Sequence, residues 1–556
     1  MNFLENVFEQ LERSAGRRVL QEIRGKQIAS VTGAELLAHI GTARSFFHKA
    51  GFRKGDRCAL LAHNSIRWVA ADLALMAEGI IVVPLYVRQA VAELIAMMKD
   101  CTPRLICCGE TSLGESLARA WRDAPRFVSF DEIFADPGVV HAQRRPVASQ
   151  VPVSREPQDL VAIIYTSGTS GEPKGVCLTV ANLDHMLACT TQRLDELMGP
   201  ASQPDRVFHY LPFNFAASWI FTLSCLSRRS LLSLSTDLNK LADEVRLAAP
   251  HYFLNVPTLL ERVRRGVEDN LRSRGGFALR IFEKAWQGFL RHASGRHQLS
   301  DTFYRAVAGL LIFPKIRARF GAHLRALICG SAPLTRDTQL FFNMLGIRVL
   351  QGYGLTETTG ICTLDDPRGP VEPGCVGPCI PGVEMVLGEN QEILVRGPNL
   401  FPGYWNRPEE TARVLRDGWF HTGDQGEVNA AGNWRIIGRI KNLIILNSGH
   451  NIAPEPIEEK LLNLLPGAQH VVLVGNGRGY ITALITGDVA EPPVSAALDT
   501  VNRDLPHYKQ VRAFHLLHEP LTIENGLITV NGKLKRDAIA ARFASEIEVM
   551  YQRKTL

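Results

Sequence analysis

The sequence predicts an α/β protein with a large N-terminal body of parallel and mixed sheets with helices, a β-rich subdomain, and a small, mobile α+β domain at the C-terminus. Three observations predict it. Over the first third of the chain, short apolar runs alternate with helical patterns of ten or more residues, which is typical of βαβ units. From about 382 to 437, short strand patterns are separated by Gly, Pro and Asn turns. After residue 438, a compact segment mixes helical and strand patterns.

The elements of the body follow one another in a regular order. A helix is expected over 32–51, because the pattern begins at Thr32, a capping residue, and stops at Gly51. The apolar run 57–61 then predicts a buried strand. The alternation continues with a helix over 65–78, a strand over 80–85, a helix over 90–100 and a strand over 104–108. Further body strands are predicted at 160–165, 206–212 and 324–329.

The β-rich subdomain is predicted from strands at 392–396 and 434–437, and it ends at the sequence GRIKN, residues 438–442. This stretch marks the boundary that we expect between an N-terminal domain of residues 1–438 and a C-terminal domain of residues 439–556. Strands of the C-terminal domain are predicted at 443–446, 470–474 and 480–485. With 556 residues and 46% of them hydrophobic, the chain can form several domains with sizeable cores, which excludes a disordered protein.

Composition also limits location and partners. The 11 cysteines are an odd number without a CxxC ladder, which argues against a disulfide framework and for the reducing cytoplasm. The longest apolar stretch, 70–87, is interrupted by Asp72, Glu78 and Pro84, and the N-terminus lacks an apolar signal core. We therefore expect a soluble protein. The net charge of +6 is too small, if spread evenly, to indicate a nucleic-acid partner.

The segment IIYTSGTSGEPKGV, residues 163–176, is the most informative part of the chain. An apolar strand leads into a loop of Gly, Ser and Thr that ends at Pro173 and Lys174. Glycines allow close approach to an anion, hydroxyl and loop N–H groups donate to phosphate oxygens, and the lysine adds a charge. The P-loop pattern does not fit, because Gly175 stands where that pattern has a Mg²⁺-binding Ser or Thr. A flexible surface loop is the alternative when the segment is taken alone.

Other motifs add groups that could bind a nucleotide. The turn QGYGLTETTG, residues 351–360, puts the hydroxyl of Thr356 beside the carboxylate of Glu357, which suits one phosphate contact and one Mg²⁺ contact. Asp424, Arg439 and Lys533 follow in glycine-flanked turns. Taken singly, each of the three is better explained by a structural role: Asp424 as a turn carboxylate, Arg439 as a surface salt-bridge residue and Lys533 as a solvated lysine.

In this order and spacing, the motifs YTSGTSGEPKG, YGLTE, TGD and GRIK closely resemble those of the adenylate-forming superfamily, which includes acyl-CoA synthetases, luciferases and the adenylation domains of nonribosomal synthetases. The resemblance extends from about residue 32 to 536. It is greatest to long-chain fatty acyl-CoA synthetases, through the segments FPKIRARFGAHLRALICGSAPL, APEPIE and ENGLITVNGKLKR.

The resemblance implies roles for particular residues. The catalytic residues would be three: Thr356 at the α-phosphate, Glu357 as the Mg²⁺ ligand, and Lys533 between the acyl carboxylate and the α-phosphate. Lys441 would be the hinge about which the small domain moves, and Gly449 would line the channel for CoA. The remaining ATP contacts would come from Thr166, Ser167, Gly168, Thr169, Ser170, Gly171 and Lys174 at the β- and γ-phosphates, from Gly330, Ser331, Ala332, Pro333, Gly352, Tyr353 and Gly354 around the adenine, and from Asp424 with Arg439 at the ribose.

Two positions depart from the family pattern. Where the family often has the histidine of an LPxxH motif beside the acyl pocket, this sequence has Phe215, and Asn451 stands where some relatives use Arg towards the nucleotide of CoA. The acyl acceptor is therefore either CoA or the phosphopantetheine of a carrier protein. Phe215 and Val256 are expected in the acyl pocket, although both are equally consistent with ordinary core packing.

The sequence thus predicts an ATP-, Mg²⁺- and CoA-dependent acyl-CoA synthetase that activates a carboxylic acid, with a medium- or long-chain fatty acid favoured. An acyl- or aryl-acid ligase that loads a carrier protein is the alternative within the family, and a non-catalytic nucleotide-binding relative is the alternative of another class. Residues 261–325 carry 14 Lys and Arg against 5 Asp and Glu, interleaved with aromatic residues. This segment is either a solvated helix pair or a peripheral contact with anionic membrane.

Overall fold

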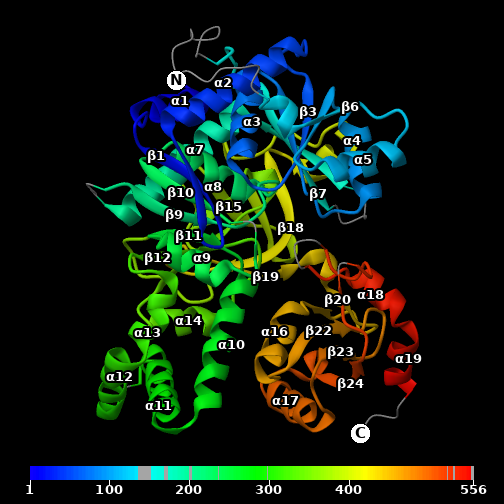
Figure 1. Cartoon of the computed structure of the whole chain (residues 1–556). Helices are drawn as coiled ribbons and strands as arrows, with labels where there is room; N and C mark the ends of the chain where they lie inside the picture. Colours follow the sequence, from blue (N-terminus) through cyan, green and yellow to red (C-terminus); the bar gives the residue numbers. More distant parts are fainter. Residues whose placement is uncertain are drawn as a thin grey trace. The chain divides into compact units, whose positions relative to one another are not determined.

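A computed structural model describes residues 1–135, 152–167, 173–199, 203–235, 237–296, 298–522, 524–529 and 533–552, without the side chains of Ser167 and Leu299 (Figure 1). The chain forms two compact units. The first comprises residues 1–384, 395–420 and 430–434, and the second comprises residues 385–394, 421–429 and 435–556. Both units combine helices with sheets, so the predicted α/β class is confirmed. Among the described residues, no helix has both the length and the hydropathy needed to cross a membrane.

The first sheet of the first unit is built from the predicted βαβ alternation. Its strand order is β6-β5-β3-β4-β7-β8, parallel except for the last pair. Helix α3 is buried along its whole length apart from Arg67, because it carries apolar residues of its own on every face. The strands are β3 (Arg57–Leu61), β4 (Ile81–Leu85), β5 (Leu105–Cys108), β6 (Arg126–Ser129), β7 (Leu160–Ser167) and β8 (Pro173–Thr179), and the helices are α2 (Gly33–Lys49), α3 (Ile66–Ala77), α4 (Val91–Cys101), α5 (Thr111–Ala120) and α6 (Phe130–Ile133).

The second sheet of this unit has the order β14-β13-β12-β11-β9-β10-β1-β2. Its strands are parallel except at the two edges. The strands are β1 (Arg18–Arg24), β2 (Gln27–Thr32), β9 (Asp205–His209), β10 (Ser230–Leu234), β11 (Tyr252–Asn255), β12 (Ala326–Cys329), β13 (Arg348–Tyr353) and β14 (Thr363–Leu364). Along the chain, α7 (Val180–Met198) precedes β9, α8 (Ala216–Leu226) connects β9 to β10, and α9 (Leu241–Ala248) connects β10 to β11.

Strand β9 is shorter than the predicted strand over 206–212. It ends at His209, and the side chain of Asn64 then takes up the backbone groups that a longer strand would pair. The Asn64 amide donates to Leu211 O at 2.7 Å, and its carbonyl accepts from Phe213 N at 3.1 Å. Pro212 has no N–H for a sheet ladder, which explains the early turn.

No element was predicted for residues 1–31, yet they form α1 (Phe3–Arg13) and the β1–β2 hairpin. Asn2 caps α1 by accepting from the N–H groups of Leu4 and Glu5, and the Glu5 carboxylate accepts from Asn2 N in return. The apolar residues of α1 recur at helical spacing and are buried. This segment therefore adds an edge to the second sheet and a helix to the core.

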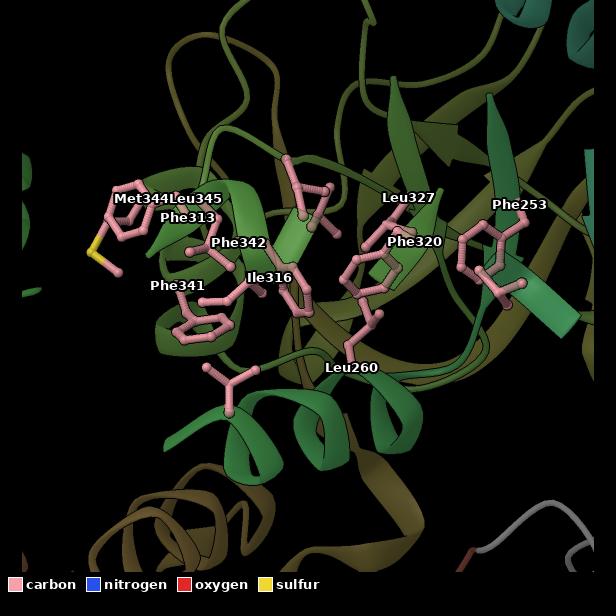
Figure 2. Packing of buried hydrophobic residues seen from close by; sticks show 14 of the residues in the cluster. Phe253, Leu260, Phe313, Ile316, Phe320, Leu327, Phe341, Phe342, Met344 and Leu345 are labelled. Carbon is pink, nitrogen blue, oxygen red and sulfur yellow. The ribbon is translucent and has the colours of Figure 1, made fainter. Parts of the chain in front are cut away.

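A large apolar core lies between the second sheet and the helices α10 (Pro257–Arg274), α13 (Phe313–Arg317) and α14 (Arg336–Met344). Figure 2 shows Leu260 on α10 rising towards Phe320 and Leu327, with Phe341 and Phe342 on α14. The two phenylalanine rings of α14 meet edge to face at 5.3 Å, and Phe320 meets Phe342 at 6.1 Å. Between α10 and α13 the chain forms α11 (Gly276–Ala293) and α12 (Leu299–Leu311).

The predicted β-rich region is a five-stranded sheet of order β15-β16-β18-β17, with β19 paired to β18. The strands are β15 (Glu384–Leu387), β16 (Glu392–Arg396), β17 (Leu415–Arg416), β18 (Trp419–Val428) and β19 (Trp434–Arg439), and a short helix α15 (Pro408–Val414) precedes β17. The strands predicted at 392–396 and 434–437 are therefore both present.

The C-terminal part of the second unit contains a three-stranded sheet, β22-β23-β24, with helices on both faces. Along β22, Val471 and Leu473 belong to the core with α16 and α17, whereas Val472 between them belongs to the core with α18 and α19. This alternation is what a strand buried on both faces requires. The elements are β20 (Ile444–Ile445), β21 (Asn451–Ile452), α16 (Glu455–Leu464), β22 (Ala468–Val474), β23 (Ile481–Gly487), α17 (Glu491–Arg503), β24 (Val511–Leu517), α18 (Arg536–Arg542) and α19 (Ala544–Gln552).

Candidate active site

The predicted phosphate loop connects two antiparallel strands of the first sheet. Thr166 on β7 is opposite Lys174 on β8, and Ser167 is opposite Pro173. Four residues of the predicted loop, Gly168, Thr169, Ser170 and Gly171, lie outside the described residues. The hairpin fixes the base of the loop, so that half-buried Thr166 and Lys174 are neighbours across the ladder.

Lys174 has two partners: Glu410 on α15 and Tyr404 in the segment that precedes α15. Its ammonium group forms an ion pair with Glu410 at 2.5 Å and lies 5.3 Å from the centre of the Tyr404 ring. The hydrogen bond from Lys174 lowers the pKa of Glu410. The lysine side chain is only 17% exposed, so its ammonium is held in one place rather than free in solvent.

Tyr404 also reaches the second motif. Its hydroxyl donates a hydrogen bond to Glu357 Oε1 at 2.8 Å. The backbone around it is held on both sides, because Phe401 N donates to Glu357 O at 2.9 Å and Trp405 N donates to Gly175 O at 2.7 Å. Residues 401–405 thus bridge the phosphate hairpin and the Thr356–Glu357 turn, and Tyr404 stands between Lys174 and Glu357.

The sequence reasoning did not identify Tyr404 or Glu410. Tyr404 is 47 positions from Glu357, and Glu410 is 236 positions from Lys174. No local spacing connects residues this far apart. The only available signal was compositional, since GYWNRPEE puts an aromatic hydroxyl and two carboxylates directly after a turn.

The Thr356–Glu357 turn is held by hydrogen bonds that two buried threonines form. Residues Thr356–Thr358 form a single 3₁₀ turn, in which the Thr358 hydroxyl accepts from Leu355 N at 2.9 Å. Thr359 has a φ of 53° and donates its hydroxyl proton to Asn399 O at 2.8 Å. Thr358 and Thr359 are fully buried, whereas Thr356 and Glu357 remain half-buried. The turn therefore holds the two predicted functional side chains on its accessible side.

The glycines predicted around the adenine lie at the carboxyl ends of β12 and β13. These strands are parallel, with Cys329 opposite Gln351, so Gly330 and Gly352 are adjacent. A Cβ at Gly330 would come within 3.1 Å of Gly352 O, and a Cβ at Gly354 would come within 2.4 Å of Gly360 O. Ser331, Ala332 and Pro333 follow β12 as an exposed turn, while Tyr353 is buried. In open α/β sheets this edge is where ligands bind.

The predicted acyl-pocket residues lie near this edge. Phe215 is the half-buried residue that precedes α8. The first turns of α8 pack on the Thr356–Gly360 turn, because a Cβ at Gly360 would lie 3.2 Å from Ile220 and 3.7 Å from Ala217. Val256 precedes α10 and packs against the large apolar core. The structure thus brings α8 to the motif that carries Glu357.

A histidine close to Phe215 in sequence also escaped prediction. His209 is fully buried between the rings of Phe213 and Phe221, at 5.4 and 5.7 Å, and its Nε2 contacts the Ser218 hydroxyl at 2.7 Å. Burial lowers the pKa of His209 to about 3, so the ring is neutral. It is a packing residue with a polar contact to α8.

In the second unit, Asp424 and Arg439 form a pair on the neighbouring strands β18 and β19. Arg439 Nε lies 2.8 Å from Asp424 Oδ1, and the Asp424 side chain is only 4% exposed. Asp424 N donates to the Thr422 hydroxyl at 3.0 Å. The two residues that were predicted to act together at the ribose are thus partners.

The segment after β19 is attached to α16 by a hydrogen bond, and an ion pair joins α16 to α18. Lys441 is exposed in a single 3₁₀ turn, Ile440–Asn442. Asn442 donates to Glu455 at 2.7 Å, and both outer nitrogens of Arg536 contact the Glu458 carboxylate at 2.7 and 2.5 Å. The start of α16 and the start of α18 are therefore tied together beside the predicted hinge.

Gly449 and Lys533 also belong to the second unit. Gly449 has a φ of 82° in the turn between β20 and β21, a conformation that favours glycine. Lys533 is exposed, its N–H donates to the Thr529 hydroxyl at 3.0 Å, and its carbonyl accepts from Thr529 N at 2.8 Å. The structure thus brings Thr166, Lys174 and Glu357 together within the first unit. Within the second unit it pairs Asp424 with Arg439.

Comparison with known proteins identifies the family to which the chain is similar. Residues 7–405 match the family described as AMP-binding enzyme, and residues 441–555 match the AMP-binding enzyme C-terminal domain. Long-chain-fatty-acid–CoA ligase FadD15 of Mycobacterium bovis is 27% identical over 591 residues, which cover 100% of this chain and 97% of the relative. The putative fatty-acid–CoA ligase fadD11 of Mycobacterium tuberculosis is 32% identical over 438 residues, covering 71% and 74%.

Solved structures give the same architecture. ATP-bound MatB from Rhodopseudomonas palustris is 25% identical, with a TM-score of 0.72 over 98% of this chain and 99% of that one. The Mycobacterium tuberculosis fatty acyl CoA synthetase is 22% identical, with a TM-score of 0.66 over 98% and 99%, and supports the fold alone. The resemblance predicted from the motifs is confirmed: the chain belongs to the AMP-binding enzymes of the adenylate-forming superfamily.

Proposed function

We propose that this protein is an AMP-forming acyl-CoA synthetase. It converts ATP and a medium- or long-chain fatty acid into an acyl adenylate, and then transfers the acyl group to the thiol of CoA. The observation that carries the proposal is the linked group of Lys174, Tyr404 and Glu357, which keeps a cation for phosphate near a carboxylate for a metal ion. The names of the mycobacterial relatives, fatty-acid–CoA ligases, support the same reaction.

The reaction has two balanced steps. First, a carboxylate oxygen of the acid attacks the α-phosphorus of ATP, a P–O bond forms, and the bond to the bridging oxygen breaks so that pyrophosphate leaves. Second, the CoA thiolate attacks the acyl carbon, a C–S bond forms, and AMP leaves with the electrons of the C–O bond. Charge accumulates around the α-phosphate in the first step, so fixed cations and donors provide the main stabilisation.

In the first unit, Lys174 and the loop 166–171 bind the β- and γ-phosphates, and Thr356 contacts the α-phosphate. Gly330–Pro333 and Gly352–Gly354 frame the adenine at the carboxyl ends of β12 and β13, where the glycines let the neighbouring backbones pack closely. Tyr404 acts as a positioning residue that contacts both Glu357 and Lys174, and Glu410 is the counter-ion that a bound phosphate would displace from Lys174.

Glu357 holds Mg²⁺. The donor set fits this ion, because one half-buried carboxylate beside the Thr356 hydroxyl leaves the remaining positions to phosphate oxygens and water, which Mg²⁺ retains readily. The bound ion would neutralise charge on the phosphate chain. The hydrogen bond from Tyr404 to Oε1 restrains the carboxylate and would orient it for the ion.

We propose that residues 439–556 are a mobile lid that follows a body of residues 1–438. Asp424 of the body and Arg439 at the start of the lid bind the ribose. Lys533 neutralises the acyl carboxylate and the α-phosphate during adenylation. Lys441 is the hinge, and Gly449 lines the path of the CoA pantetheine. The pairing of Arg439 with Asp424 supports a common task for these two residues.

Phe215 and Val256 line the acyl pocket. With Phe215 at the position where the family often has histidine, and with His209 buried and neutral, an apolar wall faces the acid chain. Such a wall supports a hydrocarbon rather than a polar acyl group. A carrier-protein acceptor remains the second candidate, favoured by Asn451 in place of a residue that would pair with the CoA nucleotide.

The test is pyrophosphate release over a panel of fatty and aromatic acids, followed by thioester formation with CoA or with a phosphopantetheinyl carrier protein. We expect the highest kcat/KM with medium- or long-chain fatty acids, and we expect acyl-CoA as the product. Strong adenylation without acyl-CoA would support the carrier-protein alternative. Absence of pyrophosphate release with every acid, despite ATP binding, would indicate a non-catalytic nucleotide-binding protein.

A further inference from the structure

Helices α11 and α12 form a hairpin whose inner face belongs to the core. A Cβ at Gly288 would lie 2.8 Å from Asp301, so the two helices approach closely there, and Arg291 forms an ion pair with the same aspartate. The rings of Phe282 and Trp286 on α11 meet Phe341 of α14 at 6.2 and 6.4 Å. The hairpin is therefore firmly anchored on the first unit, where Figure 1 draws it in green.

The outer face of α12 is also apolar. Ala308 is fully buried towards the core, but Phe303, Ala306 and Leu310, at positions i, i+3 and i+7, share the opposite side and are exposed. No charged residue occupies this strip. Apart from Met1, the three most exposed large hydrophobic side chains among the described residues all belong to this hairpin: Leu310 at 78%, Phe277 at 73% and Phe303 at 64%.

The charge of the whole protein is concentrated on the same part of the chain. Residues 276–319 contain eight Lys and Arg against Glu283 and Asp301, a local charge of +6, so the rest of the sequence sums to zero. Asp301 is paired with Arg291. The described residues offer no ion pair to the other seven cations, which are Arg280, Lys284, Arg296, Arg305, Lys315, Arg317 and Arg319.

We infer that the α11–α12 hairpin and the adjoining α13 form a docking surface for an anionic lipid membrane. Phe277, Phe303 and Leu310 enter the boundary between headgroups and acyl chains, and the cations pair with lipid phosphates. An exposed apolar strip within a strongly cationic segment is the combination that holds a helix in the membrane interface. The inference rests on this surface alone and is independent of the reaction proposed above.

The apolar strip decides between the partners that cations alone would allow. A nucleic acid could neutralise the seven cations but offers no apolar surface to Leu310 and Phe303, and an acidic protein would need a matching apolar patch beside its carboxylates. A hydrocarbon boundary does both at once, and burying each such side chain contributes about 1.5–3 kcal/mol. Binding should therefore depend on the apolar and the cationic residues together.

The experiment measures co-sedimentation of the full chain with vesicles of phosphatidylcholine alone and of phosphatidylcholine mixed with phosphatidylglycerol. We expect binding to the anionic vesicles that falls with salt, and little binding to the neutral ones. The double variant Phe303→Ser with Leu310→Ser should bind about tenfold or more weakly, as the lost burial requires. Replacing Arg280 and Lys284 by Gln should weaken binding and flatten its salt dependence.

Leu247→Ser, on the exposed side of α9, is the matched control and should bind like the unaltered protein, because this leucine is 44% exposed outside the hairpin. Unchanged ATP–pyrophosphate exchange and melting temperature would establish that the variants are folded. Equal binding to both kinds of vesicle, or undiminished binding of the double variant, would overturn the inference. So would a chain that ignores vesicles but forms dimers that the double variant abolishes, since the strip would then serve a second copy.

Discussion

The hydroxyl of Tyr404 donates a hydrogen bond to Glu357 Oε1 at 2.8 Å, while the ring of the same tyrosine lies 5.3 Å from the ammonium group of Lys174. One side chain thus contacts the proposed metal ligand and the proposed phosphate ligand. Both contacts depend on the backbone of residues 401–405, which hydrogen-bonds to the two motifs. The positions of the two functional groups are therefore coupled through Tyr404.

The variant Tyr404→Phe tests this coupling. Loss of a hydrogen bond to a charged group costs about 1.5–3 kcal/mol, so we expect KM for MgATP to rise about tenfold or more, with KM for the acid unchanged. The rise should be steepest when free Mg²⁺ is limiting, because the Glu357 carboxylate loses its orientation. ATP–pyrophosphate exchange at varied Mg²⁺ measures both. Tyr508→Phe in the second unit is the control, and an equal rise in the two KM values would assign Tyr404 a merely structural role.

Glu410→Gln tests whether this carboxylate competes with phosphate for Lys174. The ion pair is partly exposed, and such pairs contribute about 0.2–1 kcal/mol. Without the competing charge we expect ATP to bind about two- to fivefold more tightly, as measured by calorimetric titration of the nucleotide. Weaker binding would instead show that Glu410 holds the lysine in place for the nucleotide, and Glu409→Gln, one position earlier on α15, provides the comparison.

Lys533→Ala separates the two half-reactions. Removal of a cation that acts on the transition state should lower the rate of adenylation at least about a hundredfold. ATP binding, and formation of acyl-CoA from a supplied acyl adenylate, should persist. Both steps can be followed by single-turnover kinetics. Unchanged adenylation, or equal loss of both steps, would contradict the assigned role; Lys535→Ala, two positions later, is the control.

Asp72→Asn should make the first unit more stable at alkaline pH. Asp72 is buried on α3, accepts a hydrogen bond from Trp219 Nε1 at 2.9 Å, and burial raises its pKa to about 7. The unfolded chain ionises this carboxyl near pH 4, so the destabilisation begins above that pH, grows up to about pH 7 and is complete beyond it. Asparagine remains neutral throughout this window and can still accept from Trp219.

We therefore expect the melting temperature of the Asp72→Asn variant to exceed that of the unaltered protein by several degrees at pH 8 and to match it near pH 4, since about 1 kcal/mol moves the melting temperature of a domain by about 2–4 °C. Thermal unfolding followed by calorimetry across this range gives the answer. Asp131→Asn, whose side chain is 85% exposed, should show no such dependence. A difference that is constant with pH would refute the assigned titration.

Much of the fold could be predicted because its signals are local. Strands such as β3 and β16 have the predicted bounds, since a short apolar or alternating run bounded by turn residues determines them. The shortened β9 could not be predicted, because Asn64, from another part of the chain, takes the backbone groups that follow His209. Residues 1–31 carried helical spacing and a capping box, but no functional motif drew attention to them.

The sequence by itself determined the kinds of chemical group and their local setting: a glycine-rich phosphate loop ending at Lys174, a carboxylate in the turn after β13, and a family membership carried by their order along the chain. Only the tertiary structure decided which distant groups meet. It placed Tyr404 between Lys174 and Glu357, buried His209 in a neutral form, and left the outer face of α12 uncovered. The physical reason is that strand order and crossover connections bring together residues tens to hundreds of positions apart, and no local pattern of side chains encodes those encounters.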